Sequence, residues 1–361
     1  MFKLFSKSPA ASRPAARDSL KTLADYFLAL GKQGMLTLMG TCFPGEVARL
    51  IESEWPVTQA AFDALSPDDV SMVEAGVEKR YGAGTRAELA AWKTKSLPHY
   101  RREILRYGCA VLPETVCRKT RMSSANPPAE VHSMMRQDPF AGDLYSGDMV
   151  VGALNRARRA IKAGGSYLDF GCSSAALLRN MRAAFPDARW HGCDPVATAI
   201  EWAGRQFADL KVFVSKQTPP LPFDDASLDG VYAVSIWSHF SERAGLEWFD
   251  EMHRVIKPGG FLVMTTHGMR SLYFYLEKDM MPPDAIAALL ADMLANRFSF
   301  QAIPGTSGLD MTDWGNAFFR PEWVLGRLCP KWNLLDFKPG LNQCNQDVYV
   351  LERGAGAVHP G

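Results

Sequence analysis

Two acidic side chains at or near the ends of short apolar runs are the first residues of this sequence with the pattern of a binding site. Asp169 is the third residue of the run "YLDF" and lies two positions before Gly171, and Asp194 ends "WHGCD" 25 residues later. A glycine turn before a helix lets backbone N–H groups approach a ligand closely. An acid at the end of the next strand can accept hydrogen bonds from ribose hydroxyls. The pattern predicts a site for a nucleotide-like ligand, and dehydrogenases share it.

Two further segments distinguish between the families that share this pattern. They are "LPFDDASLDGVYAVSIWSHFSE", residues 221–242, and "HRVIKPGGFLVMTTHG", residues 253–268. Together with the two acidic turns, they resemble class I S-adenosylmethionine-dependent methyltransferases, and in particular bacterial members that act on sugars or other small molecules. The resemblance extends over about residues 145–353. It implies an α/β, Rossmann-like fold with a doubly wound, mostly parallel sheet of seven strands, and S-adenosyl-L-methionine as the cofactor.

The resemblance also implies contacts with that cofactor, residue by residue. Gly171 and Cys172 would face its methionine part through backbone groups, and Asp169 would fix the turn and the cofactor's amino group. Asp194 would hold the ribose, with Pro195 directly after it. The remaining implied contacts, at the turn, the adenine and the transferred methyl group, are Ser173, Gln217, Thr218, Ser235 and Ile236.

The turn after Asp169 departs from the family pattern of an acid followed by three alternate glycines. Ser173 and Ala175 stand where the second and third glycines belong. Serine fits if its φ is negative, and its hydroxyl could then cap the following helix. The methyl group of Ala175 would lie where helix, strand and ligand meet. A positive φ at either residue costs on the order of 1 kcal/mol, so we expect the turn still to bind the cofactor.

Two histidines follow the predicted fourth and fifth strands, at the edge of the sheet where ligands bind in open α/β folds. They are His239 and His267. An imidazole has an ordinary pKa near 6.5 and can take a proton from an attacking hydroxyl. We expect His239 to be this base if the acceptor is a hydroxyl, and a helix cap or packing role is the alternative. For His267 the structural role is favoured.

No Cys/His cluster has the spacing of a metal site, so the predicted reaction needs no metal.

Seven runs of sequence predict the strands of the sheet. Five are short and apolar with little alternation, as in parallel strands covered on both faces, and span residues 166–170, 189–193, 211–214, 228–235 and 260–266. Helical segments between several of them favour a doubly wound α/β sheet. The last two strands, near 334–338 and 348–352, have no helix between them. We therefore expect these two to pair antiparallel.

The pattern divides the chain into a flexible arm, a helical region, a methyltransferase domain and a tail, at residues 1–18, 19–145, 146–353 and 354–361. Ser19 is a suitable N-cap for the first helix. A helical insertion is expected within the methyltransferase domain at about 278–330. Its amphipathic helix at 282–298 is either a lid over the substrate or a layer that packs against the N-terminal helices.

Composition excludes several classes of partner. The 361 residues include 40 basic and 39 acidic side chains, a balance that does not favour nucleic acid. The longest uncharged stretches are shorter than a membrane span. Seven cysteines without a CxxC pair favour reduced thiols. The basic N-terminus has the charge of a transit peptide but no apolar region of a secretory signal. We predict a cytoplasmic protein.

The predicted function is methyl transfer to a small-molecule or glycan acceptor, with O-methylation favoured. A non-catalytic binding or assembly module is the alternative, because the turn lacks glycines and the helical region is long. A nicotinamide-dependent oxidoreductase is disfavoured, since no second glycine follows Gly171 before the helix. A homodimer is compatible with the sequence, which fixes neither the oligomeric state nor the acceptor.

Overall fold

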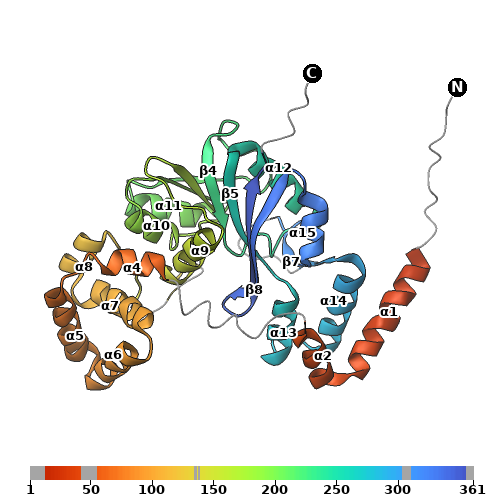
Figure 1. Cartoon of the computed structure of the whole chain (residues 1–361), viewed down its shortest axis with the longest axis horizontal. Coiled ribbons are helices and arrows are strands. Elements are labelled where there is room, and N and C mark those ends of the chain that lie inside the picture. The colour runs from red at the N-terminus through yellow and green to blue at the C-terminus, as the bar shows by residue number, and fades with distance from the viewer. Residues whose placement is uncertain (1–12, 42–54, 134–135, 137–138, 303–309, 355–361) are drawn as a thin grey trace.

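A seven-stranded sheet forms the centre of the computed structural model, which describes residues 13–41, 55–133, 136, 139–302 and 310–354 (Figure 1). The strand order is β3-β2-β1-β4-β5-β9-β8. The first five strands run parallel and are β1 (Ser166–Phe170), β2 (Arg189–Asp194), β3 (Lys211–Val214), β4 (Leu228–Ala233) and β5 (Ile256–Thr266). The last two, β8 (Trp332–Asn342) and β9 (Gln346–Arg353), pair antiparallel. The predicted doubly wound, mostly parallel sheet of seven strands is confirmed.

Two boundaries of the parallel strands differ from the predictions by more than one residue. Strand β4 ends at Ala233 rather than at Ser235, because Ser235 has a φ of +62°, which a strand does not allow. Strand β5 begins at Ile256 rather than at Gly260. The register between β4 and β5 shifts next to this early segment. The end of β4 therefore leads directly into a turn at the edge of the sheet.

Helices cover both faces of the sheet. One face carries α9 (Leu144–Arg156), α10 (Leu178–Ala184) and α11 (Ala197–Gln206), and the other carries α12 (Glu242–Val255) and α15 (Pro321–Leu328). Adjacent residues of β1 enter different cores: Tyr167 packs with the first group and Leu168 with the second. This alternation follows from the pleat of a strand, whose side chains point to opposite faces.

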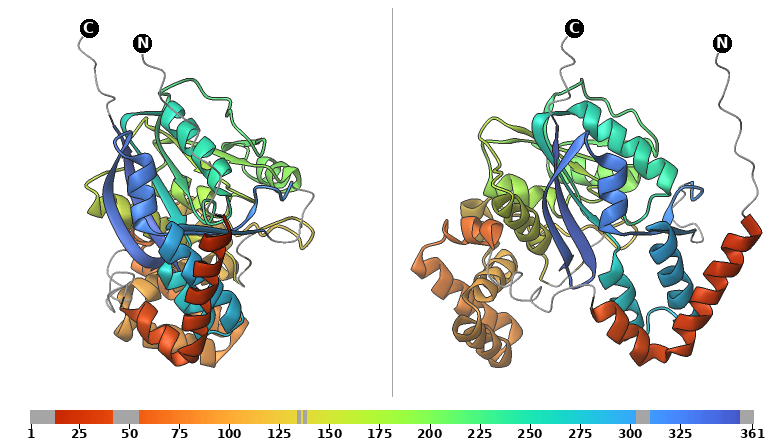
Figure 2. Two further views of the ribbon diagram at one scale, coloured as in Figure 1. Left: turned by 90° about the vertical axis from the view of Figure 1, so that its right-hand side faces the viewer. Right: turned by 45° about the vertical axis from the view of Figure 1, so that its right-hand side comes forward.

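The N-terminal helices form two separate groups on opposite sides of the sheet (Figures 1 and 2). The first group is α1 (Arg13–Ala29) and α2 (Gly31–Gly40), which pack on α13 (Met269–Glu277) and α14 (Pro283–Asn296). The second is a bundle on the side of α9 and α10, made of α4 (Pro56–Phe62), α5 (Pro67–Tyr81), α6 (Ala83–Lys95), α7 (Leu97–Val111) and α8 (Pro113–Thr120). The described residues from 13 to 133 contain no strand.

The first helix begins earlier than predicted. It starts at Arg13, so Ser19 lies inside it and does not cap it. The apolar spacing that marked this helix continues upstream through residues with good helix propensity, such as alanine and arginine. The part of the predicted arm before Arg13 lies outside the described residues, as does the tail from residue 355.

The segment predicted as a helical insertion, 278–330, also contains two strands. They are β6 (Phe298–Ala302) and β7 (Gly315–Phe319), which pair antiparallel outside the main sheet. Aromatic side chains in these short runs favour strands, and helix periodicity is a poor guide to runs of five residues. Helix α14 packs its buried face on Phe27 of α1 and its neighbours, so this helix is a packing layer and not a lid.

Two searches of the described part of the chain were negative. No helix there is both long and apolar enough to cross a membrane. No group of three histidine, cysteine, aspartate or glutamate side chains lies close enough together to hold a metal ion.

Candidate functional site

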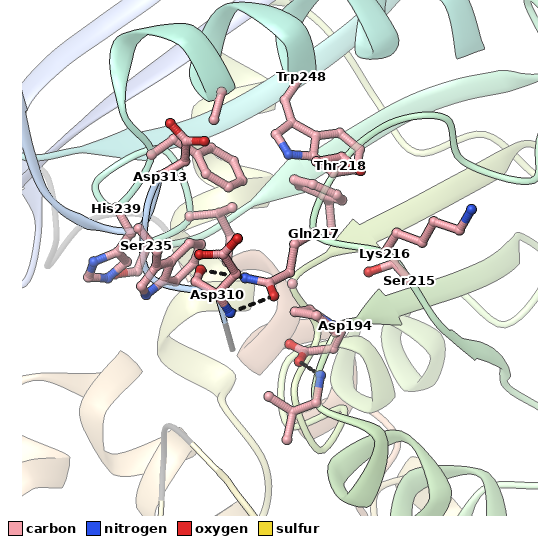
Figure 3. A pocket seen from close by; sticks show the side chains of 18 of the residues that line it. Asp194, Ser215, Lys216, Gln217, Thr218, Ser235, His239, Trp248, Asp310 and Asp313 are labelled. Atoms are coloured by element: carbon pink, nitrogen blue, oxygen red, sulfur yellow. Dashed lines mark hydrogen bonds between the residues drawn. The ribbon is translucent and has the colours of Figure 1, made fainter. Parts of the chain in front are cut away.

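Two neighbouring cavities open at the carboxyl ends of the parallel strands. The larger, of about 390 Å³, is bounded by the turns after β1, β2, β3 and β4, by the start of α12 and by residues 310–314 (Figure 3). The smaller, of about 210 Å³, lies between the turn after β1, the start of α9 and the β8–β9 connection. Both cavities are lined by Gly171, Ser173 and Ser235. The carboxyl edge of an open α/β sheet is where ligands bind in this architecture.

The residues singled out in the sequence line these two cavities. The larger cavity is lined by Gly171, Ser173, Asp194, Pro195, Gln217, Thr218, Ser235, Ile236 and His239. The smaller is lined by Asp169 and Cys172. Four separate stretches of sequence therefore meet at one edge of the sheet, because parallel strands end together there.

The turn after β1 has left-handed backbone at all three glycine positions of the family pattern. The φ angles are +84° at Gly171, +47° at Ser173 and +61° at Ala175, so the condition of a negative φ at Ser173 is not met. At Gly171, glycine is also required by space, since a Cβ would lie 2.1 Å from Cδ1 of Ile236. Ser173 and Ala175 therefore adopt the left-handed conformation without being glycine, at a conformational cost on the order of 1 kcal/mol each.

The side chain of Ser173 anchors a distant segment of the chain. Its hydroxyl donates to the carbonyl of His132 at 3.2 Å and lies 2.9 Å from the Nδ1 atom of that histidine. Ser174 donates to Ser133 at 2.9 Å in the same way. The expected helix cap is wrong, because α10 begins only at Leu178 and has no side-chain cap. The serines hold the connection from the N-terminal bundle across the turn.

Ala175 does not contact either cavity. It is fully buried and belongs to the hydrophobic core that also contains Leu178 and Met181 of α10. The expectation that its methyl group meets the ligand is therefore wrong. The left-handed backbone of the turn leaves this methyl group on the core side of the turn, so the third glycine position is a matter of packing.

Asp194 stabilises the two turns between which a ligand would lie. Its Oδ2 atom accepts from the backbone N–H of Ser173 and its Oδ1 atom from that of Val196, both at 2.9 Å. Burial raises the pKa of this carboxyl, and the two N–H donors oppose the rise. Each carboxylate oxygen can accept more than one hydrogen bond. The group can therefore hold both turns and still accept the hydroxyls of a ribose.

Asp169 is a buried acid without a sufficient partner. Its Oδ2 atom has no hydrogen-bond partner among the described residues, although the side chain lines the smaller cavity. Burial and the nearby negative charges of Asp194 and Asp143 raise the pKa of its carboxyl well above the usual value. An unpaired buried carboxylate is costly. A cationic ligand group, such as an ammonium, would supply the missing partner.

His239 presents one ring nitrogen for proton transfer. Its Nδ1 atom lies 2.8 Å from the carbonyl oxygen of Gly315. A carbonyl only accepts, so Nδ1 carries the hydrogen and, in the neutral ring, Nε2 carries the lone pair. The ring stacks on Trp314, with centroids 4.9 Å apart. Burial lowers the pKa of His239, which keeps the ring neutral and able to accept a proton at neutral pH.

His267 has the structural role that the sequence favours. It is buried, and its Nε2 atom lies 3.0 Å from the hydroxyl of Tyr275 and 3.3 Å from the amide of Gln346. Burial and the neighbouring His239 lower its pKa to about 3. Trp237, two residues before His239, is fully buried and stacks on Phe249.

Several cavity residues were not predicted. His132 had been given no role, and nothing in its spacing connects it with a turn forty residues away. Arg243, Glu247 and Trp248 lie on one face of α12, which a helical projection of the segment after β4 would have indicated. Residues 310–314 reach the site from the insertion. The backbone of Asp310 pairs with the side-chain amide of Gln217: its carbonyl accepts at 3.0 Å and its N–H donates at 2.9 Å (Figure 3).

Comparison with known proteins identifies the family of the sheet region. Residues 168–260 match a family model described as "Methyltransferase domain". Over 120 residues the chain is 30% identical to the biotin biosynthesis bifunctional protein BioHC of Teredinibacter turnerae, which covers 30% of this chain and 21% of that protein. Over 107 residues it is 27% identical to the malonyl-[acyl-carrier protein] O-methyltransferase of Hahella chejuensis. This match covers 29% of this chain and 38% of that protein.

The chain thus spans about a fifth and two fifths of the length of these two curated relatives. Among solved structures, a SAM-dependent methyltransferase from Methanosarcina mazei is similar with a TM-score of 0.40 and 17% identity, over 54% of this chain and 94% of that one. A SAM-dependent methyltransferase from Aquifex aeolicus is similar with a TM-score of 0.38 and 15% identity, over 57% of this chain and 89% of that one. The match at residues 168–260 falls on the turns that line the two cavities. Residues 168–260 thus match a methyltransferase domain, in agreement with the resemblance to the class I enzymes, whose cofactor is S-adenosylmethionine.

Proposed function

We propose that this protein transfers a methyl group from S-adenosylmethionine to a hydroxyl group of a small-molecule or glycan acceptor. The observation that carries the proposal is the hydrogen bond from Nδ1 of His239, in the cavity wall, to the carbonyl of Gly315, which leaves the lone pair of the neutral ring on Nε2. A sulfonium donor supplies an already activated methyl group. The protein's own contribution is then mainly to align the acceptor and remove its proton.

In this proposal the cofactor occupies the turns after β1, β2 and β3. Asp194 accepts hydrogen bonds from the ribose, and the unpartnered Oδ2 atom of Asp169 accepts from the amino group. Gly171 and Cys172 contribute backbone contacts at the methionine part. The positions beside the adenine are Pro195, Gln217 and Thr218. The orphaned, buried acid is the feature of the chain that best fits a cofactor bearing an ammonium group.

His239 acts on the acceptor and not on the donor. As the acceptor oxygen forms its bond to the methyl carbon, the electron pair of the breaking carbon–sulfur bond goes to sulfur. The hydroxyl proton goes to Nε2 of His239. Ser235 and Ile236 lie at the end of β4, between the turn after β1 and this histidine, where we place the transferred methyl group.

The charges around the larger cavity favour an uncharged acceptor. Two basic residues, Lys216 and Arg243, line it. The acidic residues that line it are Asp194, Glu247, Asp310 and Asp313. A carboxylate acceptor would meet this negative excess, and it would not need a base. O-methylation has a precedent in the name of one curated relative, and the histidine and the acidic lining support a hydroxyl as its site here.

The test is a two-step measurement on the full chain. Calorimetric titration with S-adenosylmethionine comes first, and the absence of binding at millimolar cofactor would favour a non-catalytic module. Transfer of a labelled methyl group is then measured over matched alcohols, sugars and carboxylic acids. Labelling of hydroxyl compounds supports the proposal. Labelling of the carboxylic acids alone would contradict it.

A further inference from the structure

A short segment of the insertion forms the wall beside His239. We call residues 310–315 the strap; it leads into β7 and lies about 75 residues beyond His239 in the sequence. Two reciprocal hydrogen bonds join them: the N–H of Gly315 donates to the carbonyl of His239 at 2.8 Å, and Nδ1 of His239 donates back at 2.8 Å. Trp314 stacks on the imidazole ring. The strap therefore touches His239 through both its backbone and its ring.

The strap is fixed to the rest of the site at two points. Asp313 accepts from the hydroxyl of Ser241 and forms an ion pair with Arg243, at the first turn of α12. Its carbonyl also accepts from the N–H of Ser241 at 3.0 Å. At the other end, Asp310 pairs with Gln217 as described above. In Figure 3, Asp310 and Asp313 approach the cavity from the side of His239.

The backbone of the strap is as constrained as its side chains. A Cβ on Gly315 would lie 2.3 Å from the carbonyl oxygen of Gln301 on β6. Only glycine therefore allows the carbonyl of residue 315 to be where Nδ1 of His239 reaches it. The β6–β7 pair sets the position of that carbonyl, and Asp313 holds the preceding residues against α12.

We propose that the strap is the positioning element of the base and that Asp313 docks it. Asp313 acts through Trp314 and Gly315, which set the ring orientation of His239 and the nitrogen that carries its hydrogen. This inference rests on the proposed function, in which His239 accepts the acceptor's proton. It assigns to the insertion a part of the reaction that the methyltransferase sheet does not supply by itself.

The titratable groups around the ring decide how its pKa responds to the strap. His267 at the end of β5 is neutral, with its pKa lowered to about 3. On α12, Arg243 pairs with both Glu247 and Asp313 of the strap. These three groups leave one net negative charge beside the ring, and burial is still the main cause of the lowered pKa of His239. Loosening the strap exposes the ring, so the pKa of His239 should rise toward its ordinary value of 6.5.

The experiment compares Asp313→Ala with a matched control on α12. Asp250→Ala also removes an aspartate that forms an ion pair, in that case an exposed pair with Lys331 away from the cavities. The imidazole of His239 is titrated by NMR in labelled protein, which reports its pKa and which nitrogen is protonated. Methyl transfer and cofactor affinity are measured on the same samples. Asp313→Asn, which keeps an acceptor for Ser241, is the rescue variant.

In Asp313→Ala we expect a higher pKa for His239, a smaller fraction of the Nδ1–H form, and a kcat lower by roughly 10- to 100-fold. The acid limb of the kcat profile should move to higher pH, cofactor affinity should stay unchanged, and Asp313→Asn should lie between. Asp250→Ala should match the wild type. If Asp313→Ala does not fold, the variants Trp314→Leu and Trp314→Phe are compared as a test of the ring contact with His239. The pKa of His239 should rise more in the leucine variant.

The inference would be overturned if Asp313→Ala left unchanged both the pKa of His239 and the ring nitrogen that carries its hydrogen. This holds whatever the role of His239. A changed pKa of His239 with an unchanged kcat would overturn it as well, because the ring orientation set by the strap would then have no effect on the rate. Loss of the proposed function gives a different result. In that case His239→Ala keeps its kcat while the NMR response to the strap remains.

Discussion

The two halves of the larger cavity are built in different ways. The half that we assign to the donor consists of turns that follow β1, β2 and β3 directly, so each contact residue lies within a few positions of a strand end. The half that we assign to the acceptor depends on His239 and on the strap. Three helices and two strands, α12 to β6, separate the strap from His239 in the sequence. The donor half is thus local in sequence, whereas the acceptor half is assembled by tertiary contacts.

This difference has an energetic side. In the donor half, positive φ angles at Ser173 and Ala175 are maintained by hydrogen bonds, including the one that the N–H of Ser173 donates to the carboxylate of Asp194. Such strain is tolerated where the environment over-determines the backbone. In the acceptor half, no comparable strain occurs in the strap, and side-chain pairs fix its position. Changes in the first half should affect cofactor binding and stability, and changes in the second should affect the rate.

The strongest test of this division is His239→Ala. We expect kcat to fall by roughly 10²- to 10⁴-fold, because the variant lacks the general base. Cofactor affinity should be nearly unchanged, since the histidine belongs to the acceptor half. Burial lowers the pKa of His239, and only the neutral ring accepts a proton. The wild-type kcat should therefore fall as the pH drops through a value below 6.5.

This acid limb should be missing in the variant, which serves as its own control for other titrating groups. A His239→Ala protein that retains most of its kcat would remove the histidine from the reaction. A large loss of cofactor affinity in that variant would instead show that the two halves are not separate.

A smaller effect, confined to binding, is expected for Asp194→Asn. The amide keeps one oxygen, which accepts from only one of the two backbone donors, Ser173 or Val196, and it loses the charge that strengthens hydrogen bonds to a ribose. Hydrogen bonds to charged groups contribute about 1.5–3 kcal/mol each, so the Kd for cofactor should rise by roughly 10- to 100-fold. Calorimetric titration measures it.

The matched control for this variant is Asp209→Asn, an exposed aspartate paired with Arg182 away from the cavities. It should bind cofactor as the wild type does. Equal affinities for Asp194→Asn and the control would mean that the acid after β2 does not hold the ribose. Asp194→Ala is less informative, because removal of both oxygens also releases the N–H groups of the two turns.

Asp169→Asn should weaken binding and stabilise the free protein. The folded-state pKa of Asp169 is raised well above its usual value, so its ionisation costs stability as the pH rises above about 4, the ordinary pKa of the unfolded chain. The neutral amide avoids this cost. We expect the Tm of the cofactor-free variant at pH 7 to exceed that of the wild type by about 2–4 °C, equivalent to about 1 kcal/mol.

The difference in Tm should shrink as the pH is lowered toward 4 and vanish below it, where the wild-type carboxyl is protonated in both states. The Kd for cofactor should rise about tenfold through loss of one charge-assisted hydrogen bond. A lower Tm for the variant at pH 7 would show that Asp169 is paired in the free protein.

The sequence was sufficient to predict which turns line the half that we assign to the donor, because those signals are local. The strand β1, the acid that ends β2 and the turn after β3 can all be read from runs of less than ten residues. The same reasoning missed β6 and β7, which have five residues each and lie within a segment rich in helix formers. It also missed the strap, since no spacing rule relates Asp313 to Ser241, 72 positions earlier.

The turn after β1 shows a different limit of sequence reasoning. The family pattern marked the residues at its glycine positions as exceptions, but pattern alone gives neither the φ of Ser173 nor the partner of its hydroxyl. That partner is His132, which the tertiary fold brings across the turn from the N-terminal side. The serine is therefore explained by a contact between distant segments.

The smallest effect is expected for Ala175→Gly, which separates conformation from ligand contact at the turn. Glycine relieves a φ of +61°, a gain of about 1 kcal/mol. It also loses a buried methyl group, about 0.8 kcal/mol, and adds about 0.5–1 kcal/mol of chain entropy to be lost on folding. The net change in unfolding free energy should therefore stay within about 1 kcal/mol. Ala176→Gly, with no positive φ to relieve, should be the more destabilised variant by chemical denaturation. Because Ala175 lines neither cavity, cofactor affinity should not change in Ala175→Gly, and a several-fold change in either direction would place this methyl group at the ligand after all.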